Sequence, residues 1–253
     1  MLNMINNILR KTKRLPFEDD DLISLLKKKY PHKESRFYYG NKRYAADALY
    51  CHAAPGTLEV SLLLLADMLQ KKSGNNRLLN LGGGTGHVSG MLQDIGFDVV
   101  NSDIGIEKED EKNVRFDLNS DGQLPFAPET FDFIMCQEVV EHIENPWRLF
   151  RTANRVLKKG GFLFLTTPNI LSQRSKKIFA KTGYFHWFTP KNLAYHINPL
   201  PHWEIEHIAG KTGFVIKELR GNAEYFFGKG EGFPRNVIIA KSECLIFIMA
   251  KEG

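Results

Sequence analysis

Short apolar runs alternate with amphipathic segments along most of the chain, and glycine or proline separates many of them. Runs this short predict buried strands, whereas apolar residues at helical spacing predict helices. The predicted strands are residues 78–81, 97–103, 114–119, 129–136, 162–167, 214–219 and 245–250, and the predicted helices are 22–30, 58–72, 88–95, 146–158 and 201–211. Because strands and helices alternate, we predict an α/β fold with a parallel, doubly wound sheet.

One turn has the features of a nucleotide-binding βα unit. The strand at 78–81 is followed directly by glycines at 82, 83, 84 and 86, and then by the helix at 88–95. Glycine adopts the backbone angles of a tight turn and lets the backbone approach a ligand, and the helix N-terminus adds free N–H groups and a positive dipole end. The dinucleotide motif G-x-G-x-x-G needs glycine where this chain has His87. The spacing therefore disfavours an NAD-dependent oxidoreductase, which we keep as a less favoured hypothesis.

Composition and charge narrow the class of protein. The chain has 253 residues and a net charge of +5, which permits an anionic partner without requiring one. No apolar stretch approaches the roughly 20 residues of a membrane span, and the first residues lack a secretory signal pattern. The three cysteines are scattered and have neither metal-ligand nor disulfide-framework spacing. We therefore expect a protein of a reducing compartment, the cytoplasm.

Three further stretches agree with the glycine turn. Asp103 ends the second strand about 20 residues beyond the glycines, where a carboxylate can accept hydrogen bonds from both ribose hydroxyls. Residues 124–143 read LPFAPETFDFIMCQEVVEHI, and the fifth strand ends in Thr167-Pro168-Asn169. With the G-x-G-x-G spacing, these stretches resemble the class I S-adenosylmethionine-dependent methyltransferases of the small-molecule type, similar to the type 11 and type 23 methyltransferase families. The resemblance implies a Rossmann-like, seven-stranded sheet whose last strand is antiparallel, and S-adenosylmethionine as the cofactor.

The resemblance also implies a set of donor-binding residues. They are Asn80, Gly82, Gly84, Gly86, Asp103, Asp117, Leu118 and Gln137, with Asp117 near the adenine amino group. One position departs from the family pattern, because Asn80 stands where an acid is usual. An amide accepts a hydrogen bond but offers no negative charge to the ammonium group of the donor. This departure supports an alternative hypothesis, a non-catalytic binding protein with the same fold.

Glu138, Glu141 and His142 follow the fourth strand at helical spacing, which predicts that they share one face of a helical turn. We assign them as the catalytic residues, with His142 as a general base, and we assign no metal ligand. Two other interpretations stay open. The three side chains could hold a divalent cation that acidifies a phenol or catechol hydroxyl, and a similar Glu-x-x-Glu-His pattern occurs in quinone-pathway O-methyltransferases. They could also be a polar helix start that only lines the donor site.

The expected acceptor is a small molecule or a lipid- or sugar-linked molecule, methylated at oxygen. Nucleic acid is disfavoured because Cys136-Gln137-Glu138-Val139 replaces the Asn/Asp-Pro-Pro-aromatic tetrad of the DNA amino-methyltransferases. We divide the chain into an N-terminal helical and aromatic cap, residues 1–56, and a methyltransferase domain, residues 57–253. Residues 170–201 are an insertion that covers the acceptor, with His186 and His196 as alternative bases.

The first 14 residues carry no acid and have apolar residues at helical spacing. This pattern predicts either a basic amphipathic helix on an anionic membrane or a helix packed on the domain. The oligomeric state is left open.

Overall fold

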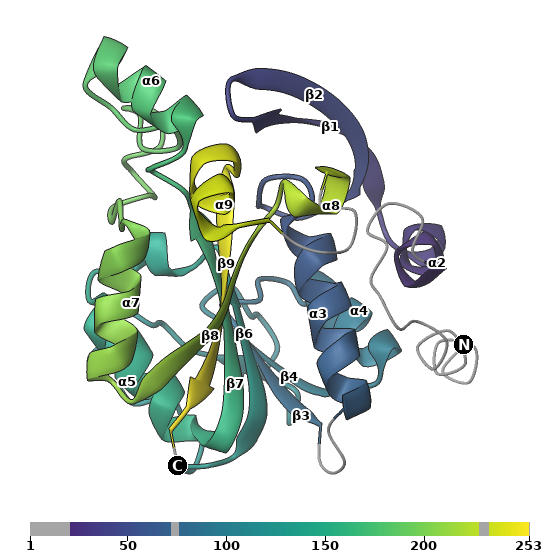
Figure 1. The fold of residues 1–253 in the computed structure, drawn as a ribbon. Helices are drawn as coiled ribbons and strands as arrows, with labels where there is room; N and C mark the ends of the chain where they lie inside the picture. The colour runs from purple at the N-terminus through teal and green to yellow at the C-terminus, as the bar shows by residue number, and fades with distance from the viewer. Residues whose placement is uncertain (1–20, 72–75, 228–232, 253) are drawn as a thin grey trace. The chain divides into compact units, whose positions relative to one another are not determined.

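The computed structural model describes residues 21–71, 76–227 and 233–252 of the chain (Figure 1). The amphipathic helix expected over residues 1–14 lies outside the described residues. Within the described part of the chain, no helix is both long enough and apolar enough to span a membrane. The chain divides into two compact units. Unit 1 comprises residues 1–74, 168–194 and 219–246, and unit 2 comprises residues 75–167, 195–218 and 247–253.

A seven-stranded sheet with the strand order β5-β4-β3-β6-β7-β9-β8 is the main element of unit 2. Its strands are β3 (Arg77–Leu81), β4 (Asp98–Asp103), β5 (Asn113–Arg115), β6 (Phe131–Gln137), β7 (Leu157–Pro168), β8 (Phe214–Gly221) and β9 (Cys244–Lys251). The first five pair in parallel, and the last strand is antiparallel. The predicted Rossmann-like fold is therefore confirmed.

The central strands of the sheet are buried, and their pairing places polar and apolar residues side by side. Asn80 of β3 stands beside Asn101 of β4 and Met135 of β6. The central strands are buried almost throughout, which explains why their sequences read as continuous apolar runs rather than as alternating ones. Because parallel strands end at the same edge, the residues after β3, β4 and β6 meet there. This edge is where open α/β sheets bind ligands.

Three helices of unit 2 lie where the sequence predicts them. They are α4 (His87–Ile95), α5 (Pro146–Val156) and α7 (His202–Lys211). Helix α5 ends two residues earlier than predicted, because β7 already begins at Leu157. Asn145 caps α5, because its side-chain oxygen accepts a hydrogen bond from the Arg148 N–H at 3.0 Å, and Pro146 occupies the first helical position. In Figure 1, α5 and α7 lie side by side along the sheet.

Unit 1 combines helices with a hairpin that the sequence did not predict. Its helices are α2 (Asp21–Lys29), α3 (Thr57–Lys71), α6 (Gln173–Thr182), α8 (Glu224–Phe227) and α9 (Arg235–Lys241). Strands β1 (His32–Tyr39) and β2 (Lys42–Leu49) pair in antiparallel register through all eight residues, from His32 with Leu49 to Tyr39 with Lys42. The segment that we interpreted as part of a helical and aromatic cap is thus largely a two-stranded ribbon, and whether it covers an acceptor stays a prediction.

A buried carboxylate connects distant segments within unit 1. An oxygen of Glu243, which is 2% exposed, accepts a hydrogen bond from the Tyr38 N–H at 2.5 Å, and the other oxygen lies 3.5 Å from Nδ1 of His186. Burial raises the pKa of Glu243 to about 7. Burial, together with the nearby charge of Arg174, lowers the pKa of His186 to about 4. Arg174 itself lies over the Tyr38 ring, 3.8 Å from its centre.

Candidate active site

The glycine turn has the geometry that its sequence predicts. Gly82, Gly84 and Gly86 all have positive φ, of 74°, 55° and 84°. A Cβ atom on Gly82 would lie 2.4 Å from a methyl carbon of Val139, so this position also needs glycine for space. Gly86 precedes the first turn of α4 as its N-cap. The turn therefore places backbone without side chains at the carboxyl edge of the sheet, where a ligand can approach it closely.

A buried polar network beneath the turn holds its shape. The side-chain amide of Asn80 donates to the Ser89 hydroxyl at 2.9 Å, and that hydroxyl donates to the side-chain oxygen of Asn101 at 3.1 Å. The amide of Asn101 donates to the Gly84 carbonyl at 3.0 Å. Asn80 is 2% exposed. In this structure its side chain supports the glycine turn from below, so a direct contact of Asn80 with the donor stays a prediction.

Sequence reasoning did not find Ser89 or Asn101. Asn101 stands between the apolar half of β4 and Asp103, and it is 2% exposed. A polar side chain at a buried strand position must find a hydrogen-bond partner. This rule would have predicted that the Asn101 side chain hydrogen-bonds to a neighbouring segment, which in the structure is the glycine turn.

Asp103 lies at the end of β4, beside the glycine turn, as predicted. One carboxylate oxygen accepts a hydrogen bond from the Gly84 N–H at 2.9 Å, and the other accepts one from the Gly105 N–H at 2.7 Å. Each carboxylate oxygen has a second lone pair, so Asp103 retains the capacity to accept hydrogen bonds from a diol. Its predicted ribose contact is compatible with this arrangement.

The remaining predicted donor residues follow β5 and β6. Asp117 and Leu118 are half-buried in the loop after β5, where the Asp117 carboxylate accepts a hydrogen bond from the Asn119 N–H at 2.8 Å. Gln137 ends β6, and its buried side-chain oxygen accepts no hydrogen bond from the described residues. Gln137 thus offers an acceptor at the edge where the glycine turn lies. Cys136 precedes it, but burial raises the pKa of its thiol and so disfavours a nucleophilic thiolate.

The prediction that Glu138, Glu141 and His142 share one helical face is wrong. Only Val140–His142 form a turn of 3-10 helix, and Glu138 precedes it with a φ of 52°. The Glu138 N–H and carboxylate are both bound to Thr166 on β7, with the Thr166 hydroxyl donating to the carboxylate at 2.7 Å. Helical spacing fails here because a left-handed residue reverses the chain directly after the strand. A catalytic role for Glu138 stays a prediction.

His196, rather than Glu138, is the third side chain that lies beside Glu141 and His142. Ligand atoms of Glu141, His142 and His196 all lie within 4.8 Å of one another. The segment that carries His196 is bound to the 3-10 turn, because the N–H groups of Ile197 and Asn198 both donate to the Glu141 carbonyl, at 2.9 and 3.0 Å. The rings of His142 and His196 meet edge to face, with 4.8 Å between their centres.

A hydrogen bond to the backbone determines which nitrogen of the neutral His142 ring carries the proton. Its Nδ1 lies 2.8 Å from the Tyr195 carbonyl oxygen, which can only accept, so Nδ1 carries a proton. In the neutral ring, Nε2 is then the basic atom. That atom lies 4.0 Å from Oε1 of Glu141. A hydroxyl oxygen about 2.8 Å from each atom fits this separation.

Glu141 is a completely buried carboxyl group. Burial, followed by the charge of Glu138, raises the pKa of Glu141 well above its usual range. Its Oε2 lies 3.4 Å from the Thr167 hydroxyl, and its Oε1 accepts no hydrogen bond from the described residues. The cluster therefore offers a basic nitrogen and a carboxyl oxygen that point to one position. One carboxylate and two imidazoles are also ligands that suit a divalent transition metal.

Residues 53–219 match the model of a family described as a methyltransferase domain, which is more than half of the chain. The chain belongs to this family. The match confirms the resemblance to class I S-adenosylmethionine-dependent methyltransferases that the sequence indicated.

Relatives and solved structures agree with the family. The ubiquinone biosynthesis O-methyltransferase of Agrobacterium fabrum is 33% identical over 121 residues, which cover 44% of this chain and 48% of that protein. The protein of the same description from Rhizobium etli is 28% identical over 155 residues, covering 57% of this chain and 62% of that protein. The chain thus spans about half the length of the curated relatives it matches. A SAM-dependent methyltransferase from Archaeoglobus fulgidus shares the fold, with a TM-score of 0.52, 17% identity, and coverage of 78% of this chain and 95% of that one.

Proposed function

We propose that the chain transfers the methyl group of S-adenosylmethionine to a hydroxyl oxygen of an acceptor that is a small molecule or a lipid- or sugar-linked molecule. The observation that carries the proposal is the arrangement of His142 beside Glu141 at the end of β6, the neighbour of the glycine-turn strand in the sheet. The O-methyltransferases of the ubiquinone pathway that the chain matches support oxygen as the methylated atom.

The donor side of the reaction requires little activation. The sulfonium methyl group is already electrophilic, so the protein must orient the donor and exclude water. In our proposal the glycine turn lets the donor approach the backbone closely, the Asp103 carboxylate holds its ribose, and Gln137 contributes its side-chain oxygen. The network of Asn80, Ser89 and Asn101 keeps the turn in place.

On the acceptor side, the hydroxyl must lose its proton as the new bond forms. In our proposal Nε2 of His142 takes that proton, the hydroxyl oxygen bonds to the methyl carbon, and the carbon–sulfur bond breaks to give S-adenosylhomocysteine. The Tyr195 carbonyl accepts a hydrogen bond from Nδ1 of His142, so Nε2 of the neutral ring is the nitrogen without a proton. The carboxyl of Glu141, whose pKa burial raises well above its usual range, lies beside the acceptor oxygen and holds it in place.

Turnover assays on a panel of catechols, simple phenols and phenols with prenyl chains test this proposal, with S-adenosylhomocysteine release as the signal. We expect His142→Gln to lose at least about a hundredfold in kcat, the usual contribution of a general base. The matched control is His207→Gln, an exposed histidine on α7 that packs against the Trp147 ring. Equal activity of the two variants would refute the role of His142.

The same assay distinguishes general-base catalysis by His142 from catalysis by a bound divalent cation. If Glu141, His142 and His196 hold a divalent cation, a chelator abolishes turnover and added Zn²⁺, Mn²⁺ or Mg²⁺ restores it, and His196→Gln is as inactive as His142→Gln. If His142 acts as the base, the chelator has no effect.

A further inference from the structure

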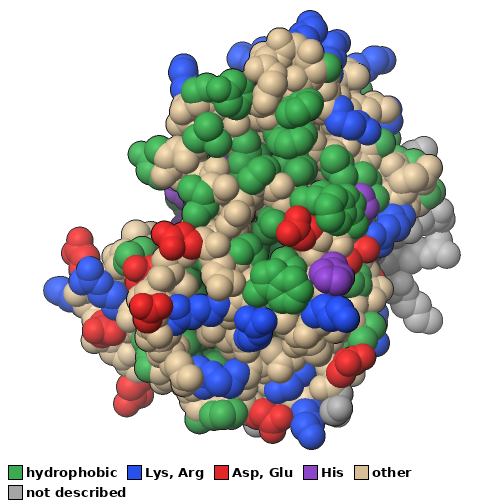
Figure 2. All heavy atoms as spheres, turned by 90° about the vertical axis from the view of Figure 1, so that its left-hand side faces the viewer, with side chains coloured by type: hydrophobic (Ala, Val, Ile, Leu, Met, Phe, Trp, Pro, Cys, Tyr) green, Lys and Arg blue, Asp and Glu red, His purple; other side chains and the backbone are tan. Residues whose placement is uncertain are grey.

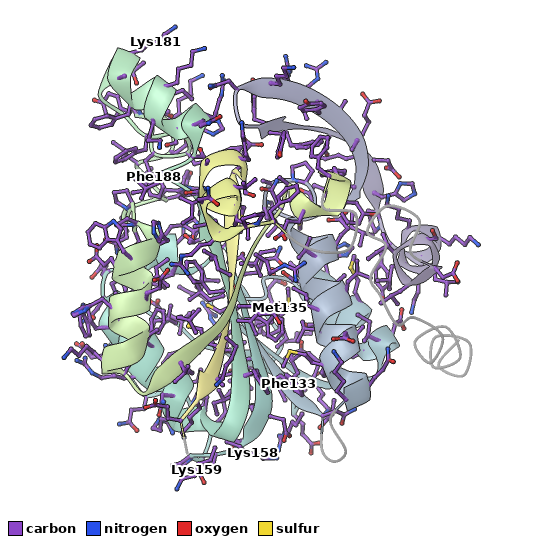
Figure 3. All side chains as sticks on the ribbon, in the orientation of Figure 1. Phe133, Met135, Lys158, Lys159, Lys181 and Phe188 are labelled. Atoms are coloured by element: carbon purple, nitrogen blue, oxygen red, sulfur yellow. The ribbon has the colours of Figure 1, made fainter. Side chains whose placement is uncertain are left out.

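The segment that follows β7 in unit 1 has an unusual charge pattern. No aspartate or glutamate occurs between Glu144 and Glu204. Within residues 173–194, which we call the basic-aromatic segment, there are five cationic side chains, Arg174, Lys176, Lys177, Lys181 and Lys191. Arg174 is engaged over the Tyr38 ring, whereas the four lysines are exposed. Figure 3 shows Lys181 at the outer end of α6.

Large apolar side chains share this surface with the lysines. Four of them are exposed: Phe179 (46%), Tyr184 (41%), Trp187 (38%) and Leu193 (44%). The Phe179 ring stacks on Phe185, with 4.5 Å between the ring centres. In the upper part of Figure 2, hydrophobic and Lys or Arg side chains lie on one face, with no Asp or Glu among them. An exposed surface of this composition marks an interaction site.

The local structure presents these side chains on a fixed frame. The Ser172 hydroxyl caps α6 by accepting a hydrogen bond from the Ser175 N–H at 3.1 Å, and Gly183 ends the helix in a left-handed conformation. The Ser175 hydroxyl in turn accepts a hydrogen bond from the His186 N–H at 3.0 Å. Trp187, with a φ of 71°, is strained for a bulky residue, and the buried Phe188 next to it anchors the chain.

We infer that the basic-aromatic segment docks on an anionic lipid surface. Lysines surrounding exposed Phe, Trp and Leu side chains match a bilayer boundary, because the ammonium groups meet anionic headgroups while the apolar side chains enter the acyl region. Trp and Tyr are the residues that settle at this boundary. A nucleic acid offers the same negative charge but no apolar phase for Phe179 and Leu193. The inference concerns binding alone, and it stands whether or not the proposed reaction occurs at oxygen.

Flotation of the full chain with vesicles tests the inference. The probes are vesicles of phosphatidylcholine alone and of phosphatidylcholine mixed with phosphatidylglycerol. We expect binding only to the anionic vesicles, with a steep loss as salt is added. Each surface lysine contributes about fivefold to such binding, so Lys176→Gln with Lys177→Gln is expected to weaken it about 25-fold. Trp187→Ser is expected to weaken it as well.

Two controls make the result specific. Lys211→Gln with Lys217→Gln removes the same charge from exposed positions of unit 2 and is expected to bind vesicles like the unmodified chain. Removal of residues 1–14, the other basic segment, is expected to leave most of the binding. Titration with S-adenosylmethionine checks that each variant keeps a folded donor site, independently of vesicle binding and of turnover.

Three outcomes would overturn the inference. The first is no binding to anionic vesicles. The second is binding that the lysine and Trp187 variants retain but the shortened chain loses. The third is binding to duplex DNA that is tighter than binding to vesicles and depends on the same lysines.

Discussion

Gly83→Ala is the substitution that most directly tests the polar network beneath the glycine turn. Gly83 has no positive φ, so its backbone alone does not require glycine. A Cβ atom there would lie 2.1 Å from the Asn101 side-chain oxygen and 2.3 Å from the Asn80 side-chain nitrogen. Both amides are buried and held by Ser89, so neither can move away without losing a hydrogen bond. Gly84→Ala is the matched comparison, because Gly84 has a φ of 55° but nothing within 4 Å of its Cβ position.

The structure predicts different losses of unfolding free energy for the two substitutions. Gly84→Ala carries only the cost of a left-handed alanine, about 1–2 kcal/mol. Gly83→Ala carries overpacking of about 1–3 kcal/mol and about two disrupted hydrogen bonds at about 1 kcal/mol each, so we expect a loss of about 3–5 kcal/mol. A third variant, Gly210→Ala in α7, meets no atom within 4 Å and has no positive φ, and it is expected to be neutral or to stabilise by up to about 1 kcal/mol.

Urea unfolding without ligand, followed by circular dichroism, measures the free energy of unfolding of the three variants. We expect Gly83→Ala to be the least stable and Gly210→Ala the most stable. If Gly83→Ala is no less stable than Gly84→Ala, the amides beneath the turn are free to move, and the account of Asn80 as a support of the turn is wrong.

Three other predictions concern the network beneath the turn, the loop before β6 and the buried carboxylate of Glu243. Ser89→Ala removes the hydroxyl between Asn80 and Asn101, so we expect a loss of about 2 kcal/mol in unfolding free energy and weaker donor binding by calorimetry. Arg155→Met removes two hydrogen bonds from the guanidinium to the Phe126 and Leu124 carbonyls, at 2.6 and 2.7 Å; we expect a loss of about 2 kcal/mol by urea unfolding, and an unchanged midpoint would contradict the anchoring role. The variant His186→Gln leaves Glu243 as the titrating group of this pair. Its pKa is about 7 in the folded state against an ordinary value of 4.5, so the folded state binds more protons than the unfolded state between these values. The free energy of unfolding therefore falls as pH rises from about 4.5 to about 7. The variant Glu243→Gln leaves His186, whose pKa is about 4 in the folded state against an ordinary value of 6.5, so the unfolded state binds more protons between these values. The free energy of unfolding therefore rises from about pH 4 to about pH 6.5. Thermal melting across this pH range must show opposite slopes for the two variants.

The sequence predicts the parts of the fold that local rules determine. The Asn145-Pro146 start of α5, the strand before the glycine turn and the positive φ of Gly82, Gly84 and Gly86 all follow from residues adjacent in the chain. Each depends on backbone preferences or on apolar periodicity, which do not require knowledge of distant segments.

The parts that the sequence missed depend on distant contacts or on single backbone reversals. The hairpin β1–β2 has polar and aromatic residues without clean alternation, and its register appears only in the pairing of the two strands. Glu138 leaves the expected helical face because its left-handed backbone binds Thr166 of β7. His196 joins Glu141 and His142 through hydrogen bonds to a segment that follows in the chain only after β7 and α6. Helical spacing within one short segment cannot reveal such a partner.

Calorimetric titration with S-adenosylmethionine, S-adenosylhomocysteine and NAD tests the central claim most directly, repeated with Asp103→Ala. Thermal melting of both forms without ligand shows whether the variant stays folded after losing the carboxylate contacts to Gly84 and Gly105. We expect micromolar binding of the methyl donor and its product, none of NAD, and loss of both signals in Asp103→Ala. Binding of NAD alone, or no binding of the donor and product by the folded chain, would contradict the account.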